Sequence, residues 1–451
     1  MKPIFRATLP LLLTALLLAA CGSGQVVERT VVVERTVEVV VTPTPQRPPE
    51  AGKTILRVGT GDSGAGLEPH QAIIARFEAE NPDIQVQLEP VGSGDYYERI
   101  FNQIAAGDPP DILQIGDDAV PTFVDRGALV PLDAFIADPA YPLDLGIYLP
   151  GVTEPGRWAG SQYLLPKDFT PLAVYYNRRL FDQFGVPYPQ DGWTWEEFLS
   201  TAQALTRDTD GDGATDVWGV QLTGDWTTGY EYWVAAAGGR LVSPDGAGFI
   251  GYLDSPQSVE AAQFFHDLYH VHRVAPIPEN LSPFAPGNEQ FAEGAAAMRI
   301  FGRWPQAGLR QSEAVDLGVV GLPRHVRRAN ILLWSGFGIS SLSPNREAAW
   351  RFLRFYVGEQ GAEVWKDWGL PTVRSVAETA GLDQDPIEGV WLGELEHLVP
   401  RAYTSVPTWG RTGDPALAKL LTRLITRPEA DITTALYDAA IEAQGALVQQ
   451  Q

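Results

Sequence analysis

The segment RDTDGDGATDVWG, which begins at Arg207, carries aspartates at a spacing that suits a calcium ion. They fall at the first, third, fifth and ninth positions of an EF-hand-like loop and are Asp208, Asp210, Asp212 and Asp216. Gly219 stands at the twelfth position, where an EF-hand has a bidentate glutamate, so a further ligand would have to come from elsewhere. We predict a structural calcium site. The alternative is a solvated acidic turn without metal, because aspartate and glycine are ordinary turn residues.

Tryptophan is abundant in this chain, which contains 13 of them. Such rings often fill cores, but carbohydrate sites also use them, because a flat aromatic face packs against the C–H face of a sugar ring. The net charge of -23 argues against a nucleic-acid partner and against electrostatic binding to anionic lipid, since phosphates would be repelled.

Strand and helix patterns alternate along the first part of the chain. A buried strand is predicted from Thr54 and a helix from Glu68 to Asn81. A second strand follows, in which Ile84, Val86 and Leu88 alternate with polar residues, so that one face is covered. This order is typical of a parallel sheet with helices on its faces. The chain after Thr54 is longer than one core usually organises, so we expect two lobes.

The N-terminal end has the layout of an export signal. Lys2 and Arg6 precede an apolar run that ends in Ala19 and Ala20, and this run is too short to cross a bilayer as a mature helix. The residues up to Cys21, the only cysteine, resemble the lipobox of bacterial lipoproteins, which implies that Cys21 carries a lipid. The alternative is an ordinary secretory signal that happens to contain a cysteine.

A signal peptide is therefore predicted over residues 1–20 and a tether over residues 21–53. The tether contains the short repeat VERTVV and VERTVE, followed by TPTP, and favours an extended, solvated spacer. We expect a monomer outside the cytoplasm, anchored by its lipid to the cell membrane, on the cell surface or in the periplasm.

Several phrases along the chain are informative as a set: FEAENPDIQVQLEPV, IAAGDPPDILQI, DRGALVPLDAFI, DGWTWEEFLSTAQAL, QFAEGAAAMRIFGRW and WGLPTV. Together they resemble family 1 extracellular solute-binding proteins, the sugar-binding components of ABC importers related to maltose-binding protein. The resemblance runs in order from Thr54 to the last helix. It implies an α/β protein with the two-lobed, type II periplasmic-binding-protein-like fold, each lobe being a mostly parallel sheet flanked by helices.

The resemblance also implies that three crossings of the chain join the lobes. We place these hinges near residues 166–170, 320–323 and 369–372. The first lobe would then hold residues 54–168 and 323–369, and the second lobe residues 171–320 and 372–451. Ligand lies between such lobes, where loops at the strand ends converge.

Acidic and hydroxyl side chains in several loops are candidates for hydrogen bonds to sugar hydroxyls, because a charged acceptor makes the stronger bond. They are Asp62, Ser63, Asp117, Asp118, Asp168, Thr170 and Glu231. The resemblance matches Asp118 to a sugar-contacting aspartate of maltose-binding protein. It also places Thr170 where that relative has a ligand glutamate, which departs from the maltose pattern.

Aromatic candidates could stack against the apolar face of a sugar. The resemblance matches Trp304, in GRW, to a stacking tryptophan of the family, and Trp409, in VPTWGRT, more loosely. Further candidates are Trp226, Tyr230 and Trp334. The alternative for each is core packing, since aromatic residues are mostly buried.

The resemblance implies a substrate-binding lipoprotein of an ABC importer, with a sugar or oligosaccharide as ligand and the permease subunits as partners. Closure of the lobes on the ligand needs no bond-making. One alternative is a secreted carbohydrate-active enzyme that uses Asp117 and Asp118 as acid and base. Adjacent residues seldom place two carboxyl groups on opposite sides of a bond, so we expect no enzymatic activity. Another alternative is an adhesive surface lipoprotein.

Overall fold

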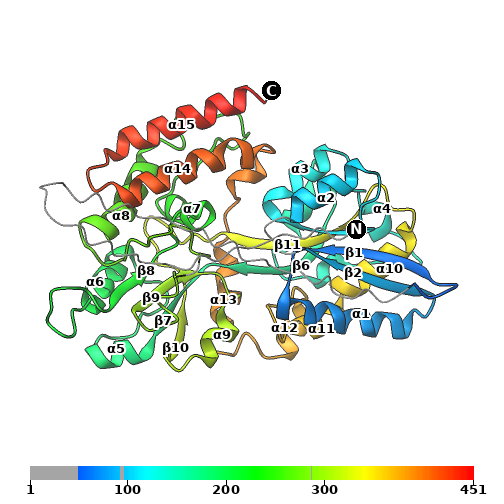
Figure 1. Ribbon diagram of the computed structural model, residues 1–451, viewed down its shortest axis with the longest axis horizontal. Coiled ribbons are helices and arrows are strands. Elements are labelled where there is room, and N and C mark those ends of the chain that lie inside the picture. Colours follow the sequence, from blue (N-terminus) through cyan, green and yellow to red (C-terminus); the bar gives the residue numbers. More distant parts are fainter. Residues whose placement is uncertain (1–48, 92–95, 286, 451) are drawn as a thin grey trace, which may run out of the picture. The chain divides into compact units, whose positions relative to one another are not determined.

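The computed structural model describes residues 49–91, 96–285 and 287–450. The predicted signal peptide, Cys21 and most of the predicted tether lie outside these residues. Within them, no helix is long and apolar enough to cross a bilayer. Most strands gather into two sheets, which Figure 1 shows with their helices.

The first sheet contains five strands in the order β2-β1-β3-β11-β6. Their bounds are β1 (Thr54–Thr60), β2 (Ile84–Pro90), β3 (Ile112–Gly116), β6 (Leu165–Pro171) and β11 (Leu332–Ile339). β1 runs parallel to β2 and β3, whereas β11 runs antiparallel to β3 and β6. The helices in this part of the chain are α1 (Glu68–Glu80), α2 (Tyr96–Ala105), α3 (Val120–Asp125), α4 (Asp133–Ile136), α10 (Arg346–Val357) and α11 (Glu359–Trp365).

The strand β2 differs from the prediction on its polar face. Its apolar face packs in the core as expected, but Gln85 is also fully buried and Glu89 is 8% exposed. Arg57 Nε donates to Glu89 Oε1 at 2.6 Å, and the backbone N–H of Glu50 donates to Gln85 Oε1 at 2.8 Å. Neighbouring segments therefore cover side chains that the alternation of residues alone would leave in solvent.

The second sheet contains four strands in the order β10-β7-β9-β8. They are β7 (Ala173–Asn177), β8 (Trp218–Gln221), β9 (Ala296–Phe301) and β10 (Leu317–Val320). β7 runs antiparallel to β9 and β10, whereas β8 runs parallel to β9. The α/β class is confirmed, but both sheets are mixed rather than mostly parallel, because β11 and β7 run against their neighbours.

The remaining elements are mostly helices. They are α5 (Arg178–Phe184), α6 (Trp195–Leu205), α7 (Thr227–Ala236), α8 (Pro256–His270), α9 (Gln306–Gln311), α12 (Arg374–Thr379), α13 (Glu388–Gly393), α14 (Gly413–Thr426) and α15 (Ile432–Val448), with the short strands β4 (Arg157–Trp158) and β5 (Ser161–Gln162).

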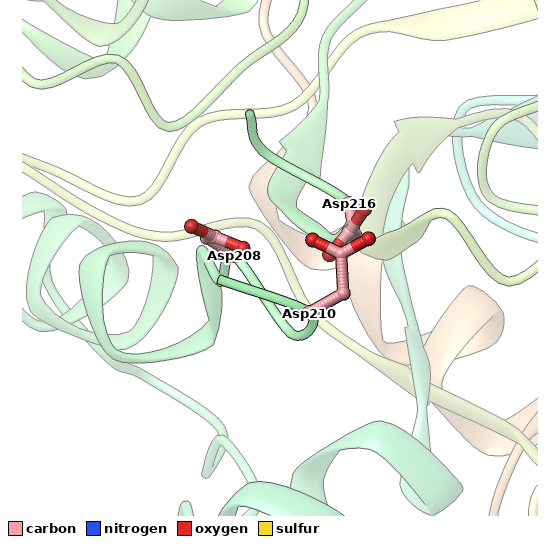
Figure 2. A group of neighbouring side chains, drawn as sticks. All are labelled: Asp208, Asp210 and Asp216. Atoms are coloured by element: carbon pink, nitrogen blue, oxygen red, sulfur yellow. The ribbon is translucent and has the colours of Figure 1, made fainter. Parts of the chain in front are cut away.

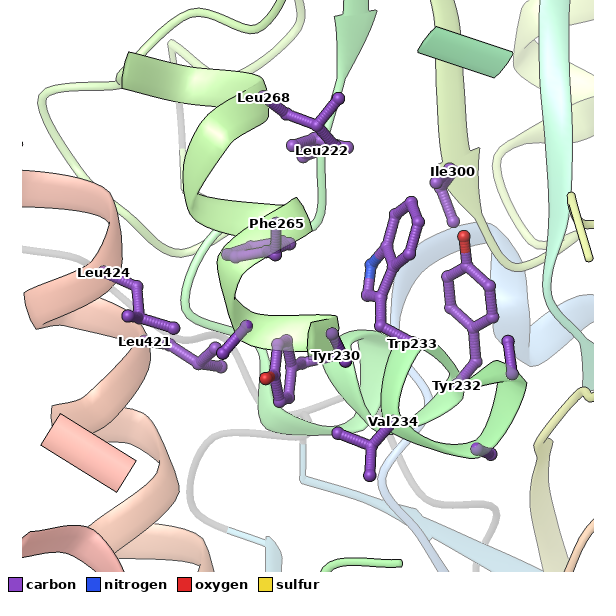
Figure 3. Close-up of a cluster of buried hydrophobic side chains, with 14 of the residues drawn as sticks. Leu222, Tyr230, Tyr232, Trp233, Val234, Phe265, Leu268, Ile300, Leu421 and Leu424 are labelled. Carbon is purple, nitrogen blue, oxygen red and sulfur yellow. The ribbon is translucent and has the colours of Figure 1, made fainter. Parts of the chain in front are cut away.

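Aromatic side chains of α7 fill the core beside the second sheet. Tyr230, Tyr232 and Trp233 are each 0% exposed. Figure 3 shows them close to Phe265 of α8 and Ile300 of β9. Tyr230, which the sequence offered as a ligand-binding residue, is thus part of the hydrophobic core.

The chain passes between the sheets at short connections. Only Leu172 separates β6 from β7, and the chain returns to the first sheet between β10 and β11. The predicted limits of the two lobes stay a prediction.

Candidate functional site

A cavity of about 510 Å³ lies where segments of both sheets meet. Its walls come from the loop after β1, the end of β3, the strands β6 and β11, the turn after β9 and the segment after α11. The predicted residues that line it are Asp62, Asp168, Thr170, Trp304 and Trp334. The fold therefore brings five of the predicted residues to one cavity, which we call the Lys167 cavity.

Lys167, Asp62 and Asp168 form one wall of this cavity, which we call its polar floor, and the buried lysine joins the two aspartates. Lys167 Nζ lies 2.6 Å from Asp62 Oδ2 and 3.2 Å from Asp168 Oδ2, and its side chain is 2% exposed. The two aspartate side chains are 28% and 34% exposed, so they remain open to the cavity. Ser335 Oγ donates to Asp168 Oδ1 at 2.5 Å. One cation thus fixes two carboxylates that still have room to accept hydrogen bonds.

The neighbours of these groups keep the ion pairs charged. Burial alone would raise the pKa of Asp62, but Lys167 and His70, whose Nε2 lies 2.7 Å from Asp62 Oδ2, outweigh it and lower that pKa. Burial opposes the charge of Lys167, yet Asp168 and Asp62 raise its pKa. Burial also lowers the pKa of His70, which contacts Tyr356 Oη at 2.9 Å. The floor therefore has two acidic side chains against one ammonium group.

Thr170 ties the turn after β9 to the crossing strand. Its Oγ1 accepts a hydrogen bond from the backbone N–H of Arg303 at 3.0 Å. Arg303 is held in turn by Glu388, to which its Nε donates at 2.7 Å and its Nη2 at 3.1 Å. Thr170, predicted as a ligand contact, thus positions the turn that carries Trp304.

Trp304 presents an open indole ring at the cavity and is 48% exposed. Its ring centroid lies 4.8 Å from that of Phe301 and 6.0 Å from that of the half-buried Trp226. Trp334 is only 5% exposed, and its Nε1 donates to the backbone oxygen of Val152 at 2.7 Å. Of the predicted tryptophans, Trp304 therefore has the ring face that a ligand can reach.

A second buried cation binds two other predicted residues. Arg401 Nη1 donates to Asp117 Oδ2 at 2.7 Å, and Arg401 Nε donates to Glu231 Oε2 at 3.1 Å. Tyr403 Oη donates to the same Asp117 oxygen at 2.7 Å, and the backbone N–H of Ala402 donates to Glu231 Oε1 at 2.5 Å. Burial opposes the charge of Arg401, but Asp117 and Glu231 outweigh it and raise its pKa. Protein groups therefore already occupy both carboxylates.

Arg401, Asp117, Glu231 and Tyr403 form a group that we call the Arg401 cluster. A cavity of about 440 Å³ adjoins it. Asp117, Arg401 and Tyr403 line it, and much of its remaining wall is apolar, with Val120, Pro121, Leu332, Leu398, Val399 and Pro400. The buried charged groups on this wall are paired with one another. The Lys167 cavity, with its open carboxylates and exposed indole, is the better candidate for a polar ligand.

Asp118 lies beside the Arg401 cluster, and its side chain is exposed. Protein nevertheless surrounds much of it, and this burial, together with the charge of Asp117, raises the pKa of Asp118 to about 6. It does not line either of the two cavities described above. A reachable carboxylate with a raised pKa is a feature of binding sites. That Asp118 binds the ligand stays a prediction.

The other predicted residues lie apart from the Lys167 cavity. Trp409 is 6% exposed and packs with its ring centroid 6.0 Å from that of Phe249, so it is a core residue. Ser63 is exposed in the loop after β1. Trp226 lies beneath Trp304 and contacts it edge to face.

The sequence reasoning missed Lys167, His70, Trp368 and Arg401. The adjacent charges of Lys167 and Asp168 in the otherwise uncharged strand LPKDFTP were a usable signal, because a charged pair inside a buried strand needs partners. Nothing local marks Arg401, since Asp117 lies 284 residues away in the sequence.

The acidic loop brings three of its four predicted ligands together (Figure 2). Oxygen atoms of Asp208, Asp210 and Asp216 lie within 4.8 Å of one another, and all three residues are exposed. Asp212 is not part of this group, and its Oδ1 accepts from the backbone N–H of Ala214 at 2.7 Å.

Comparison with known proteins gives a consistent picture. The family model described as bacterial extracellular solute-binding protein matches residues 62–363. A maltotriose-binding protein of Pyrococcus abyssi is 23% identical over 363 residues, which cover 76% of this chain and 72% of that protein. An ABC substrate-binding protein of Listeria monocytogenes, solved with cycloalternan, is 22% identical with a TM-score of 0.77, covering 88% of this chain and 99% of that chain.

A further solved structure has a different kind of ligand. UgpB of Mycobacterium tuberculosis, in complex with glycerophosphocholine, is 20% identical with a TM-score of 0.76 and covers 88% of this chain and 100% of that chain. These likenesses confirm the two-lobed α/β fold.

Proposed function

The chain belongs to the bacterial extracellular solute-binding proteins, and we propose that it captures a sugar or an oligosaccharide and delivers it to the permease of an ABC importer. The observation that carries this proposal is the Lys167 cavity. It combines carboxylates that can accept hydrogen bonds from hydroxyls with an indole face that can pack against C–H groups. Both features suit a polyhydroxylated ring.

The charges of the cavity favour a neutral ligand over a phosphorylated one. Its floor has two carboxylates against the single ammonium group of Lys167, which is paired with both. The remaining cation of the described lining, Arg303, makes a bidentate pair with Glu388. A phosphate would therefore meet a negative floor and paired cations.

Capture needs no covalent chemistry. The cavity is lined by strands of the first sheet and by the turn after β9 of the second sheet. A ligand that contacts both of these parts stabilises the arrangement in which it makes all its contacts. The extra affinity for that arrangement shifts the population toward it. The matched relatives are binding proteins, which favours this mechanism over an enzymatic or adhesive role.

The experiment that tests the proposal is a thermal-shift screen of the purified chain with neutral mono- and oligosaccharides, and with glycerol 3-phosphate as the anionic ligand. A ligand that binds only the folded state raises the melting temperature. We expect a rise with at least one neutral sugar that W304A abolishes. A rise with glycerol 3-phosphate alone would contradict the neutral-sugar assignment.

We further propose that the protein works outside the cytoplasm as a lipoprotein anchored through Cys21. The extracellular family supports the location, and the residues around Cys21 support the lipid. Metabolic labelling with a radioactive fatty acid should mark the natural chain and not C21S. Equal labelling of both chains, or of neither, would contradict the anchor.

The acidic loop is proposed to hold a structural calcium ion. The convergence of Asp208, Asp210 and Asp216 supports this, since calcium prefers several carboxylate oxygens. Titration of chelator-treated protein with calcium should release or absorb heat, and D210N should weaken that signal. A titration without heat would contradict the proposal.

A further inference from the structure

Exposed aromatic side chains that the sequence did not single out lie at or near the Lys167 cavity, beside the predicted Trp304. Trp304 is 48% exposed, Trp368 is 42% exposed, and both line the cavity. Phe284 is 56% exposed, and its ring centroid lies 6.3 Å from that of Trp304. Contiguous exposed apolar groups at a polar cavity indicate a surface that is covered when a ligand is present.

Hydrogen bonds fix the residues that precede Phe284. Asn288, which is 7% exposed, donates from Nδ2 to the backbone oxygens of Asn280 at 2.7 Å and Ser282 at 2.6 Å. The backbone N–H of Asp225 donates to Leu281 O at 3.1 Å. Residues 280–282 are thus fixed by buried and backbone hydrogen bonds, although the ring of Phe284, two residues later, gains little burial.

The rings of Phe284 and Trp304 lie close together and nearly parallel. Their planes differ by only 24°, while Trp226 supports both edgewise, at 76° to Phe284 and 79° to Trp304. Two neighbouring exposed rings can contact more of a ligand than one ring can. A single sugar ring packed on Trp304 would leave the face of Phe284 uncovered.

Trp368 borders the cavity from a different segment. It follows α11, and its backbone oxygen accepts from Arg303 Nη1 at 3.5 Å, beside the turn that carries Trp304. Its backbone N–H donates to Trp365 O at 2.9 Å. Trp368 therefore adds a second exposed indole to the lining of the cavity.

We propose that Phe284 and Trp368 are specificity-determining residues that select a ligand of several sugar rings. One ring occupies the floor beside Asp62, Asp168 and Trp304, and further rings pack on Phe284 and Trp368. This inference rests on the proposed function, and it assigns the ligand to neutral oligosaccharides rather than monosaccharides.

The test is calorimetric titration of the full chain with two series of one to four rings: glucose to maltotetraose, and N-acetylglucosamine to chitotetraose. We expect affinity to rise with ring number in at least one series. F284A and W368A should each lower the affinity for the longest sugar about tenfold and change that for the shortest less than about twofold, whereas F284Y should keep the natural affinity. Melting temperatures without sugar check that each variant folds.

Y437A is the matched control, because Tyr437 is 51% exposed on α15 and does not line the cavity. It should bind every sugar like the natural chain. Affinity that does not rise with ring number, or equal losses for short and long sugars in F284A and W368A, would overturn the inference and leave the proposed function intact. Failure of every sugar in both series to bind would overturn the inference, and a thermal-shift screen without any rise for neutral sugars would contradict the proposed function as well.

Discussion

Among the residues that the structure describes, the buried cations Lys167 and Arg401 each contact two carboxylates, and the two groups have opposite consequences. Lys167 lies between Asp62 and Asp168, whose side chains stay 28% and 34% exposed. Arg401 lies between Asp117 and Glu231, whose side chains are both 9% exposed. The first group borders open space with acceptors to spare, whereas the second is closed by its own hydrogen bonds.

The difference follows from the donors that surround each acid. A guanidinium carries five N–H donors, and Arg401 is helped by Tyr403 and the backbone N–H of Ala402, so Asp117 and Glu231 are largely satisfied by protein. An ammonium has three donors and lies at one side of its carboxylates. An acid beside a buried cation is therefore a binding candidate only if part of it stays reachable.

Removal of the Arg401 side chain should have the largest effect on stability. R401A leaves two buried carboxylates without their cation, so we expect the free energy of unfolding to fall by about 3–5 kcal/mol. Chemical denaturation followed by tryptophan fluorescence measures this change. R411A, at an exposed position of the same segment, should change it by less than about 0.5 kcal/mol.

The corresponding change at the other cation should cost less stability and more binding. In K167M the carboxylates of Asp62 and Asp168 can be solvated from the cavity, so we expect a loss of about 1–3 kcal/mol. The sugar affinity should also fall, because the two carboxylates lose the group that orients them. K366M removes a surface lysine and should do neither; a loss in K167M as large as in R401A would remove the distinction between the two groups.

Neutralising one acid in each group should give opposite results. D168N weakens an acceptor open to the ligand and should lower sugar affinity about tenfold, with a smaller loss of stability than D117N because Asp62 still pairs with Lys167. D117N should lower stability and leave sugar affinity nearly unchanged. Titration calorimetry and denaturation on both variants check the pattern, and the reverse result would move the binding site to the Arg401 cluster.

The smallest expected effects are in the pH dependence of stability. Because the pKa of Asp62 is lowered in the folded state, Asp62 adds to the free energy of unfolding above pH about 4. This contribution is lost as the pH falls further. The pKa of Asp118 is raised to about 6, so the folded protein binds a proton at Asp118 more tightly than the unfolded chain does. The contribution of Asp118 to the free energy of unfolding therefore decreases as the pH rises from about 4 to 6. Solvent screening keeps this second change below about 1 kcal/mol.

Stability curves of single variants separate these contributions. D62N should flatten the curve below pH about 4, and D118N should flatten it between pH about 4 and 6. If D118N leaves that interval unchanged, Asp118 is solvated like an ordinary surface carboxylate.

Much of the fold followed from local patterns. The alternation from Thr54 onward predicted the first strands and helices, since residue periodicity reflects which side of an element is covered. The direction of β11 and β7 did not follow, because strand direction depends on which distant strand becomes the neighbour. The convergence of Asp208, Asp210 and Asp216 was predictable because all its members lie in one short loop.

The sequence by itself determined which residue types could bind a sugar and in which loops they stand. Only the tertiary structure decided which of them stay free. Trp304 and Trp409 are chemically equal, yet one is 48% exposed and the other is 6% exposed in a core. Asp117 and Asp168 are likewise equal, but Arg401, which is 284 residues away from Asp117, occupies the first of them. Burial and pairing depend on contacts between distant segments, and the local sequence does not contain that information.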